Sequence, residues 1–177
     1  MFKVFIDGGE GTTGLRLAQR LKQRKDIELL SISADLRKNL DARLEKIDMA
    51  DVAFLCLPDA ASREVAAAAR DCDTKIIDTS TAFRCDPNWA YGFPELGPSY
   101  FHAIQESSRI SNPGCHATGS IAVLAPLVKA GLIAPDGLYT LTSLTGYSGG
   151  GKKMIASYEN LHDRELDAPR IYGLNQQ

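Results

Sequence analysis

Short apolar runs alternate with segments of helical periodicity over the first part of the chain. Four runs have the length and side chains typical of β-strands, and they occupy residues 2–6, 27–33, 52–57 and 75–78. The run 52–57 is almost purely apolar, as expected for a parallel strand that is covered on both faces. Leu15, Ala18 and Leu21 recur at helical spacing, and residues 60–70 are rich in alanine. This alternation predicts βαβ units, and therefore a parallel sheet of the α/β class.

The pattern changes after residue 78. Residues 79–99 hold many turn and aromatic residues without a helix or strand period, and such long segments in compact domains tend to be functional. A helix, a strand and a longer helix are predicted next, over residues 100–107, 109–111 and 117–129. Pro126 is expected to bend or end the longer helix. The Thr-rich alternation of 138–145 predicts a strand of a second sheet, and 152–161 is a short amphipathic segment.

A glycine-rich turn follows the first predicted strand. Within residues 8–14, Gly9, Gly11 and Gly14 satisfy G-x-G-x-x-G, and Gly8 extends the match to G-x-x-G-x-x-G. Glycine suits a backbone that turns sharply and approaches a pyrophosphate, while the next helix presents its free N–H groups to the anion. The position between a strand and a helix favours a dinucleotide site over a tight turn without a ligand. The predicted cofactor-binding residues here are Gly8, Gly9, Gly11, Thr12, Thr13 and Gly14.

The end of the second predicted strand bears on the choice between NAD and NADP. Asp35 lies near the distance at which an acidic residue binds the ribose hydroxyls of NAD. Ser33, Arg37 and Lys38 crowd the same turn, however, and a hydroxyl with two cations suits a 2′-phosphate. The sequence therefore favours NADP(H), although Arg37 and Lys38 as ordinary solvated charges are an equal alternative.

Cys115 follows a turn and begins a predicted helix, in the segment Asn-Pro-Gly-Cys-His. The unpaired N–H groups and the positive dipole end of a helix start favour the thiolate form. The same N–H groups can stabilise an oxyanion on a carbonyl that the sulfur attacks. The alternative is an inert thiol that packs as a small hydrophobe, which describes Cys56 within its apolar strand. Cys72 and Cys85 lack the turn-to-helix context.

Two further segments have features of anion binding. Arg84 follows the fourth predicted strand and can pair bidentately with a carboxylate or phosphate, with a surface salt bridge as an equal alternative. The segment Ser-Gly-Gly-Gly-Lys at residues 148–152 is either an anion-binding nest or a flexible hairpin. No catalytic base stands out among the histidines, which are His102, His116 and His162.

Composition narrows the functional classes. The 177 residues carry 20 Lys+Arg against 22 Asp+Glu, and this balance without a basic stripe argues against nucleic-acid binding. No apolar run approaches the roughly 18 residues that span a bilayer, and the N-terminal residues lack a signal-peptide pattern. The 4 cysteines form no C-x-x-C pair, which predicts free thiols and no metal site. We therefore expect a cytoplasmic globular protein that binds small molecules.

The glycine turn and four later segments, in this order and spacing, resemble the short (type 2) form of the N-acetyl-gamma-glutamyl-phosphate reductase family. The later segments are residues 78–84, 91–96, 112–119 and 148–152. The Asn-Pro-Gly-Cys element is the specific part, because the related aspartate-semialdehyde and glyceraldehyde-3-phosphate dehydrogenases surround their nucleophilic cysteine with different residues. The resemblance covers essentially the whole chain.

This resemblance implies an NADPH-dependent enzyme of arginine biosynthesis that reduces N-acetyl-glutamyl 5-phosphate to the semialdehyde and releases phosphate. Cys115 would attack the acyl phosphate to give a thioester, which a hydride reduces to a thiohemiacetal that collapses to the aldehyde. Substrate binding is assigned to Arg84, Asn112, Ser148 and Gly149. We expect a Rossmann-type NADP-binding domain over 1–110, the start of an α+β catalytic domain over 111–177, and a homo-oligomer.

Family members are markedly longer than this chain. Their catalytic histidine lies in a motif that is absent here, and we expect it just after the segment that resembles residues 172–177. The chain is therefore expected to be incomplete at its C-terminus. Two alternatives stay open: a related semialdehyde dehydrogenase that acts on another acyl phosphate, and a non-catalytic NADP-binding module with a redox-sensing role.

Overall fold

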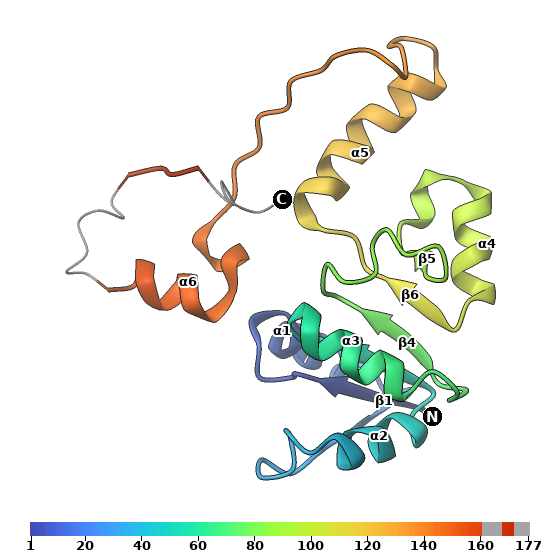
Figure 1. The fold of residues 1–177 in the computed structure, drawn as a ribbon, viewed down its shortest axis with the longest axis vertical. Helices are drawn as coiled ribbons and strands as arrows, with labels where there is room; N and C mark the ends of the chain where they lie inside the picture. Colours follow the sequence, from blue (N-terminus) through green and yellow to red (C-terminus); the bar gives the residue numbers. More distant parts are fainter. Residues whose placement is uncertain (161–167, 172–177) are drawn as a thin grey trace. The chain divides into compact units, whose positions relative to one another are not determined.

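Six parallel strands form the sheet of the computed structural model, which describes residues 1–160 and 168–171 (Figure 1). The strands are β1 (Phe2–Asp7), β2 (Ile27–Leu30), β3 (Val52–Leu55), β4 (Lys75–Asp78), β5 (Ala90–Tyr91) and β6 (Arg109–Ser111). Their order is β2-β1-β3-β4-β6-β5, and every neighbouring pair is parallel. The predicted α/β class with a parallel sheet is thus confirmed.

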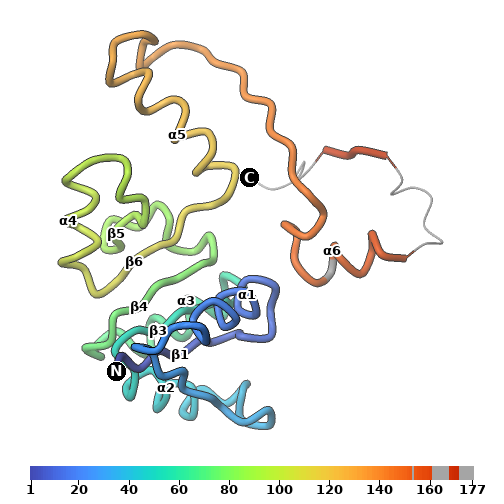
Figure 2. The backbone as a smooth tube through the Cα atoms, turned by 180° about the vertical axis from the view of Figure 1, so that it is seen from behind, coloured from blue at the N-terminus to red at the C-terminus, as the bar shows by residue number. Residues whose placement is uncertain are grey.

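Helices connect the first four strands. The helices of this region are α1 (Thr12–Leu21), α2 (Leu40–Asp48), α3 (Asp59–Ala68), α4 (Pro98–Glu106) and α5 (Cys115–Lys129). Both Figure 1 and Figure 2 show α1 and α2 on opposite sides of β1, and α2 also contacts α3. The chain leaves β1 toward β2 and then returns across it to β3. This reversal makes the carboxyl ends of β1 and β3 the switch point where open α/β sheets bind ligands.

The core lies between the central strands and the helices. Its largest fully buried apolar side chains are Phe5, Ile47, Leu55, Val65 and Ile76. Burial of one such side chain contributes about 1.5–3 kcal/mol relative to exposure, so this cluster holds β1, β3 and β4 in fixed register. The loops at the carboxyl ends of these strands therefore start from well-defined points.

At the amino ends of the strands, two cationic side chains donate hydrogen bonds to carbonyl groups at the ends of helices. Arg109, the first residue of β6, donates from Nη2 to the carbonyl oxygen of Ala69 after α3, at 2.8 Å. Lys75, the first residue of β4, donates from Nζ to the carbonyl oxygens of Ile104 and Gln105 in α4, both at 3.0 Å. Terminal carbonyls of a helix lack intrahelical partners, and a cation there also interacts favourably with the dipole. These contacts fix α3 and α4 against the sheet.

Helix α2 lies in a segment for which the sequence pattern predicted no element. The side chain of Asn39 caps it by accepting a hydrogen bond from the backbone N–H of Ala42 at 2.9 Å. Leu40, Leu44 and Ile47 have helical spacing, and all three contribute to the core. The cap and this spacing are the signals that identify the helix.

The helix predicted over 117–129 is confirmed as α5, which continues through Pro126 to Lys129, so Pro126 does not end it. The strand predicted over residues 138–145 is wrong. No strand forms over residues 138–145, and Leu138 and Leu144 are 102% and 94% exposed. A strand needs a neighbour to pair with, and the described residues provide none there, so the sheet of β1 to β6 is the only sheet that they contain.

The chain divides into two units, Met1–Thr142 and Ser143–Gln177. In the second unit, a 3₁₀ turn η2 (Tyr147–Gly150) leads into helix α6 (Gly151–Tyr158), which covers most of the amphipathic segment noted at residues 152–161. The rings of Tyr147 and Tyr158 stack with centroids 5.2 Å apart. The predicted domain boundary at 110/111 stays a prediction, while His162 and residues 172–177 lie outside the described residues. No described helix is long and apolar enough to cross a membrane.

Candidate functional site

The turn after β1 needs glycine at both of its ends. Gly8 has φ +78°, and a Cβ atom there would lie 2.2 Å from the carbonyl oxygen of Cys56, just after β3. A Cβ atom on Gly14 would lie 2.6 Å from the carbonyl oxygen of Gly8. Gly9 and Gly11 are not crowded in this way. The turn thus passes directly across the end of β3, and the start of α1 packs on the turn.

Helix α1 begins at this turn with free donors. Thr12 and Thr13 are its first two residues, and the N-cap Gly11 supplies no side-chain hydrogen bond. The N–H groups of the first turn of a helix have no intrahelical partners, and they carry the positive end of the dipole. The turn and the helix start therefore form a cradle for an anion.

A cleft of about 460 Å³ begins at this cradle. The glycine turn, α1 and the end of β2 supply its walls, which include Gly8, Gly9, Glu10, Leu15, Ala18, Leu29, Leu30, Ser31 and Ile32. Arg37 also lines it, and its Nη1 lies 3.4 Å from Oε1 of Glu10. The lining of the cleft is therefore largely apolar, and its two cationic residues are Arg37 and Lys22.

The other two predicted 2′-phosphate contacts lie outside the lining of the cleft. The hydroxyl of Ser33 donates to the carboxylate of Asp35, and this hydrogen bond is the main cause that lowers the pKa of Asp35. Lys38 is exposed in the same turn between β2 and α2. The structure places Arg37 beside the glycine turn. Ser33 and Lys38 are close to Arg37 in sequence but do not line the cleft.

Replacement of Gly14 by alanine is expected to lower the free energy of unfolding by about 2 kcal/mol. The new methyl group would overlap backbone atoms of Gly8 and Gly9, which have little room to move, and overpacking of this kind costs about 1–3 kcal/mol. Gly119→Ala is the matched control, because Gly119 lies inside α5 with no atom within 4 Å of its Cβ position. The control should be neutral or stabilising by up to about 1 kcal/mol. Urea unfolding of both variants measures the difference, and equal values would contradict the crowding at Gly14.

The predicted nucleophile lies at a turn between β6 and α5. Cys115 is the first residue of α5 and is exposed. The N-cap Gly114 makes no side-chain capping bond, while its carbonyl oxygen accepts from the N–H and the hydroxyl of Thr118, both at 2.8 Å. The turn itself is held by the N–H of Asn112, which donates to the carbonyl oxygen of Asp78 at 2.8 Å. Cys115 therefore lies at a free helix start, as the sequence predicted.

Arg84 lies against this turn. Its Nε donates to the carbonyl oxygen of Asn112, and its Nη2 donates to the carbonyl oxygen of Thr79, each at 3.2 Å. The structure thus brings together Arg84 and Asn112, two of the predicted substrate-binding residues. Both of these bonds go to backbone carbonyls rather than to a carboxylate.

The loop that carries Arg84 has several anchors of its own. Asp78 is fully buried, and its Oδ2 accepts from the N–H of Ser80 at 3.0 Å and from the Ser80 hydroxyl at 2.6 Å. Asp59, at the start of α3, accepts hydrogen bonds from the N–H and the hydroxyl of Thr81. The Thr81 hydroxyl is the main cause that lowers the pKa of Asp59. The loop is therefore tied to both β4 and α3.

Ser148 and Gly149, the other predicted substrate-binding residues, belong to η2 of the second unit. The N–H of Gly149 donates to the carbonyl oxygen of Gly146 at 3.0 Å. Gly150 precedes α6 and supplies no side-chain cap, so the N–H groups at the start of α6 have no capping side chain. Their role in substrate binding stays a prediction.

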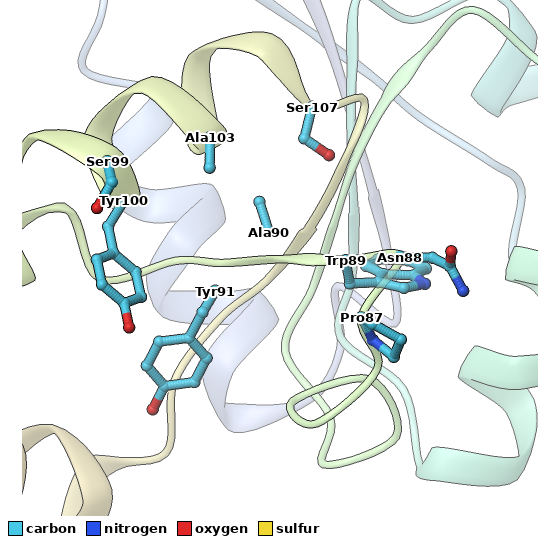
Figure 3. Close-up of a pocket in the computed structure, with 9 residues that line it drawn as sticks. All are labelled: Pro87, Asn88, Trp89, Ala90, Tyr91, Ser99, Tyr100, Ala103 and Ser107. Atoms are coloured by element: carbon cyan, nitrogen blue, oxygen red, sulfur yellow. The ribbon is translucent and has the colours of Figure 1, made fainter.

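A second hollow, of about 530 Å³, lies between β5, α4 and the segment before β5 (Figure 3). Figure 3 shows Tyr91 and Tyr100 pointing in the same direction, with Trp89 and Pro87 on the far side of Ala90. None of the predicted site residues lines this hollow. The candidate site is therefore the carboxyl edge of the sheet, where the glycine turn and the turn before Cys115 lie.

Two family models match the chain, one on each side of this nucleophile turn. Residues 3–104 match the semialdehyde dehydrogenase NAD binding domain, and residues 115–176 match the semialdehyde dehydrogenase dimerisation domain. The chain belongs to the semialdehyde dehydrogenase family. The first model ends before the nucleophile turn, and the second begins at Cys115.

Curated members of this semialdehyde dehydrogenase family are similar to the chain over nearly all of its length. The N-acetyl-gamma-glutamyl-phosphate reductase of Chelativorans sp. (strain BNC1) is 50% identical over 174 residues, which cover 97% of this chain and 55% of the relative. The N-acetyl-gamma-glutamyl-phosphate reductase 2 of Pseudomonas putida is 46% identical over 171 residues, with the same coverage. The chain thus spans about half the length of the curated relatives it matches.

Solved semialdehyde dehydrogenases share the fold. Aspartate semialdehyde dehydrogenase II from Vibrio cholerae superposes with a TM-score of 0.67 at 19% identity, over 100% of this chain and 57% of that one. The enzyme from Francisella tularensis gives 0.65 at 18% identity, over 89% and 48%. At these identities the likeness supports the fold.

The thiols of this semialdehyde dehydrogenase chain differ in environment. Cys115 and Cys85 are exposed, whereas Cys56 and Cys72 are half-buried. Burial is the main cause that raises the pKa of Cys56, and nearby Asp7 raises it further, while a hydrogen bond with Thr79 opposes the rise. A thiol with a raised pKa stays protonated at neutral pH, and the thiolate is the reactive form.

Alkylation is therefore expected to modify Cys115 first and Cys56 last. Cys85 serves as the internal control, because it is equally exposed but lies in a loop away from any helix start. Iodoacetamide labelling at pH 7.5, followed by peptide mass spectrometry, gives each rate. We expect Cys56 to react more slowly than Cys115, because burial shields its sulfur and its raised pKa leaves a smaller fraction of thiolate. Equal alkylation rates for Cys115 and Cys56 would contradict the difference between an exposed thiol at a helix start and a half-buried one.

Sequence reasoning missed one buried ion pair of this semialdehyde dehydrogenase chain. Nε of Arg43, on α2, donates to Oδ2 of Asp7 at 2.8 Å, and both side chains are buried. Burial raises the pKa of Asp7, and Arg43 acts in the opposite direction. Asp7 is the last residue of β1, directly before Gly8, so the pair holds α2 beneath the glycine turn. An acidic residue that ends an apolar strand is the one signal of this pair in the sequence.

Proposed function

We propose that the protein that carries this chain reduces N-acetyl-L-glutamyl 5-phosphate to N-acetyl-L-glutamate 5-semialdehyde, with NADPH as the reductant, and releases phosphate in arginine biosynthesis. The observation that carries this proposal is the exposed thiol of Cys115 at the uncapped start of α5. Helix α5 follows β6, and the glycine cradle follows β1 of the same sheet. Relatives named N-acetyl-gamma-glutamyl-phosphate reductase, at 42–50% identity, support the choice of substrate.

The residues at the switch point of the sheet fit a dinucleotide. Gly8 and Gly14 allow the turn to pass close to the end of β3 and the start of α1 to pack on the turn, and this arrangement presents the N–H groups of Thr12 and Thr13 to a pyrophosphate. We assign the 2′-phosphate to Arg37 at the rim of the cleft, with Ser33 and Lys38 in the same turn. When bound, NADPH supplies the hydride.

Cys115 performs the covalent step of the proposed reaction. Its thiolate sulfur forms a bond to the acyl carbon of the substrate, and the bond from that carbon to the phosphate oxygen breaks, so phosphate leaves with the electron pair. The oxygen of the attacked carbonyl carries negative charge on the way, and the N–H groups at the start of α5 are placed to donate to it. The product on the protein is a Cys115 thioester.

The remaining predicted site residues hold the substrate in this proposal. Asn112 and Arg84 lie beside the nucleophile, and Arg84 has Nη1 left for an anionic group of the substrate after its two backbone bonds. Ser148 and Gly149 are assigned to the same task from the second unit. We further propose a division into an NADP-binding domain over 1–110 and a catalytic domain over 111–177, a cytoplasmic location and a homo-oligomer, the last supported by the dimerisation-domain match.

Turnover by the protein expressed from its complete coding sequence tests the proposal. We expect phosphate-dependent reduction of NADP⁺ with N-acetylglutamate semialdehyde, and little with aspartate semialdehyde or NAD⁺. Activity confined to aspartate semialdehyde would instead identify a dehydrogenase for another acyl phosphate. Binding of NADPH without turnover of any substrate in the panel would identify a non-catalytic nucleotide-binding module.

A further inference from the structure

We propose that Arg84 is a positioning residue, whose guanidinium fixes the turn of residues 112–114 and thereby the place of Cys115, through backbone contacts that need no substrate. The inference rests on the proposed function, because it assumes that Cys115 is the nucleophile. It assigns a task to Nε and Nη2 of Arg84, whereas the proposed substrate contact uses Nη1.

The guanidinium bridges the loops that follow two neighbouring strands. Thr79, which accepts from Nη2 of Arg84, follows β4, and Asn112, which accepts from Nε, follows β6. Each bond is 3.2 Å long. A guanidinium is a planar fork that can reach both carbonyls from one fixed orientation, whereas an ammonium group is a compact point charge on a flexible stem. Arginine is therefore suited to this bridge in a way that lysine is not.

Gly114 gives an independent indication of the same contact. A Cβ atom on Gly114 would lie 2.7 Å from Nη1 of Arg84 and 3.3 Å from its Cζ. The φ angle of Gly114 is −75°, a value that any residue adopts, so the backbone itself does not require glycine. The three atoms nearest to that Cβ position all belong to Arg84. Glycine at this position therefore leaves room for the guanidinium against the turn.

The loop that carries Arg84 is a firm base for this contact. The Ser80 hydroxyl, held by the buried Asp78, accepts from the N–H of Ala82 at 3.1 Å. Nη2 of Arg63, on α3, donates to the carbonyl oxygen of Ala82 at 2.7 Å. The loop is held by β4 and α3. The hydrogen bond from Arg84 to Asn112 therefore fixes the turn before α5 relative to these two elements.

The position of the turn matters because Cys115 comes directly after it. A helix start favours negative charge only within its first turn, so fraying of α5 would separate the sulfur from the N–H groups that stabilise it. Precise placement of a reacting group also accounts for a large part of catalytic rate. Loss of the Arg84 bridge should therefore slow the reactions of Cys115 even with a reagent that has no anionic group to bind.

Three single variants and one double variant of the protein expressed from its complete coding sequence test this. Alkylation of Cys115 by uncharged iodoacetamide, measured on its peptide, is expected to slow about fivefold in Arg84→Met, which is the size of a typical helix-terminus interaction. Arg84→Lys should be as slow, although it keeps the charge. Gly114→Ala should match both, because it displaces the guanidinium without removing it. The combination of Arg84→Met with Gly114→Ala should be no slower than either alone.

Deuterium exchange and turnover give separate readouts. The amides of residues 112–118 should exchange faster in all three variants, and kcat at saturating substrate should fall in Arg84→Lys as far as in Arg84→Met. The exposed Arg70→Met is the control and should change nothing. A wild-type alkylation rate in Arg84→Lys, additive effects in the double variant, or an effect confined to KM would overturn the inference. Alkylation and exchange do not depend on turnover, so these results stay distinct from a failure of the proposed reaction.

Discussion

Cys115→Ser is expected to lower kcat for N-acetylglutamate semialdehyde by about 1,000-fold or more, in the protein expressed from its complete coding sequence. A serine hydroxyl is not ionised near neutral pH, so the free helix start of α5 would have no thiolate to stabilise. Removal of the nucleophile of a covalent mechanism typically costs several orders of magnitude in kcat. Steady-state assays with NADP⁺ and phosphate measure the effect.

Nucleotide binding should survive this substitution. The glycine turn and the cleft belong to β1, α1 and β2, and Cys115 does not line that cleft. NADPH affinity, measured by calorimetry, should therefore stay within about twofold of wild type. Cys85→Ser is the matched control, since it removes another exposed thiol, and it should keep full activity. Wild-type turnover by Cys115→Ser would contradict both the proposed covalent step and the proposed function.

Arg43→Met is expected to lower the free energy of unfolding by about 3–5 kcal/mol at pH 7.5. The change leaves the Asp7 carboxylate buried without its cation, and removal of one partner from a buried pair costs about this much. Arg16→Met is the control, because Arg16 is an exposed residue of α1, and it should stay within about 0.5 kcal/mol of wild type. Urea unfolding of both variants measures the two changes.

The cost of Arg43→Met should depend on pH. Burial raises the pKa of Asp7 in the folded state, and loss of Arg43 removes the main opposing cause, so the rise becomes larger. A carboxyl group with a raised folded pKa takes up a proton on folding, so stability is lost as pH increases from the unfolded pKa of about 3.9 through the folded value. The variant should therefore lose less stability, relative to wild type, at pH 5 than at pH 7.5. A small loss that is the same at both values would argue against the buried pair.

The sequence predicted those parts of the fold that depend on local pattern. The apolar run of β3 and the glycine turn between β1 and α1 are local signals, and the structure has both elements where they were expected. The alternation of 138–145 looks like a strand for the same local reason, but strand formation also needs a partner elsewhere in the chain. Helix α2 also has a local signal, in its Asn39 cap and in the spacing of Leu40, Leu44 and Ile47, but the prediction overlooked it.

The candidate site also combines features that have a local sequence signature with contacts between residues far apart in the chain. The turn before Cys115 has a local signature, and its place at the start of α5 followed from the sequence. The bridge from Arg84 to Thr79 and Asn112 joins residues up to 28 positions apart, and only the β4–β6 pairing brings them together. The same holds for Asp7 and Arg43, which are 36 positions apart. Spacing along the chain does not encode such contacts.

The stacked rings of Phe83 and Trp89 provide a natural optical probe of the loop that carries Arg84. Trp89 is the single tryptophan among the 177 residues, and its ring lies parallel to that of Phe83, with centroids 4.0 Å apart. Phe83 directly precedes Arg84, and the guanidinium of Arg63 lies 5.4 Å from the Phe83 ring. Any movement of this loop would change the surroundings of the indole. Intrinsic fluorescence from one native residue can therefore follow the loop in real time, without a label.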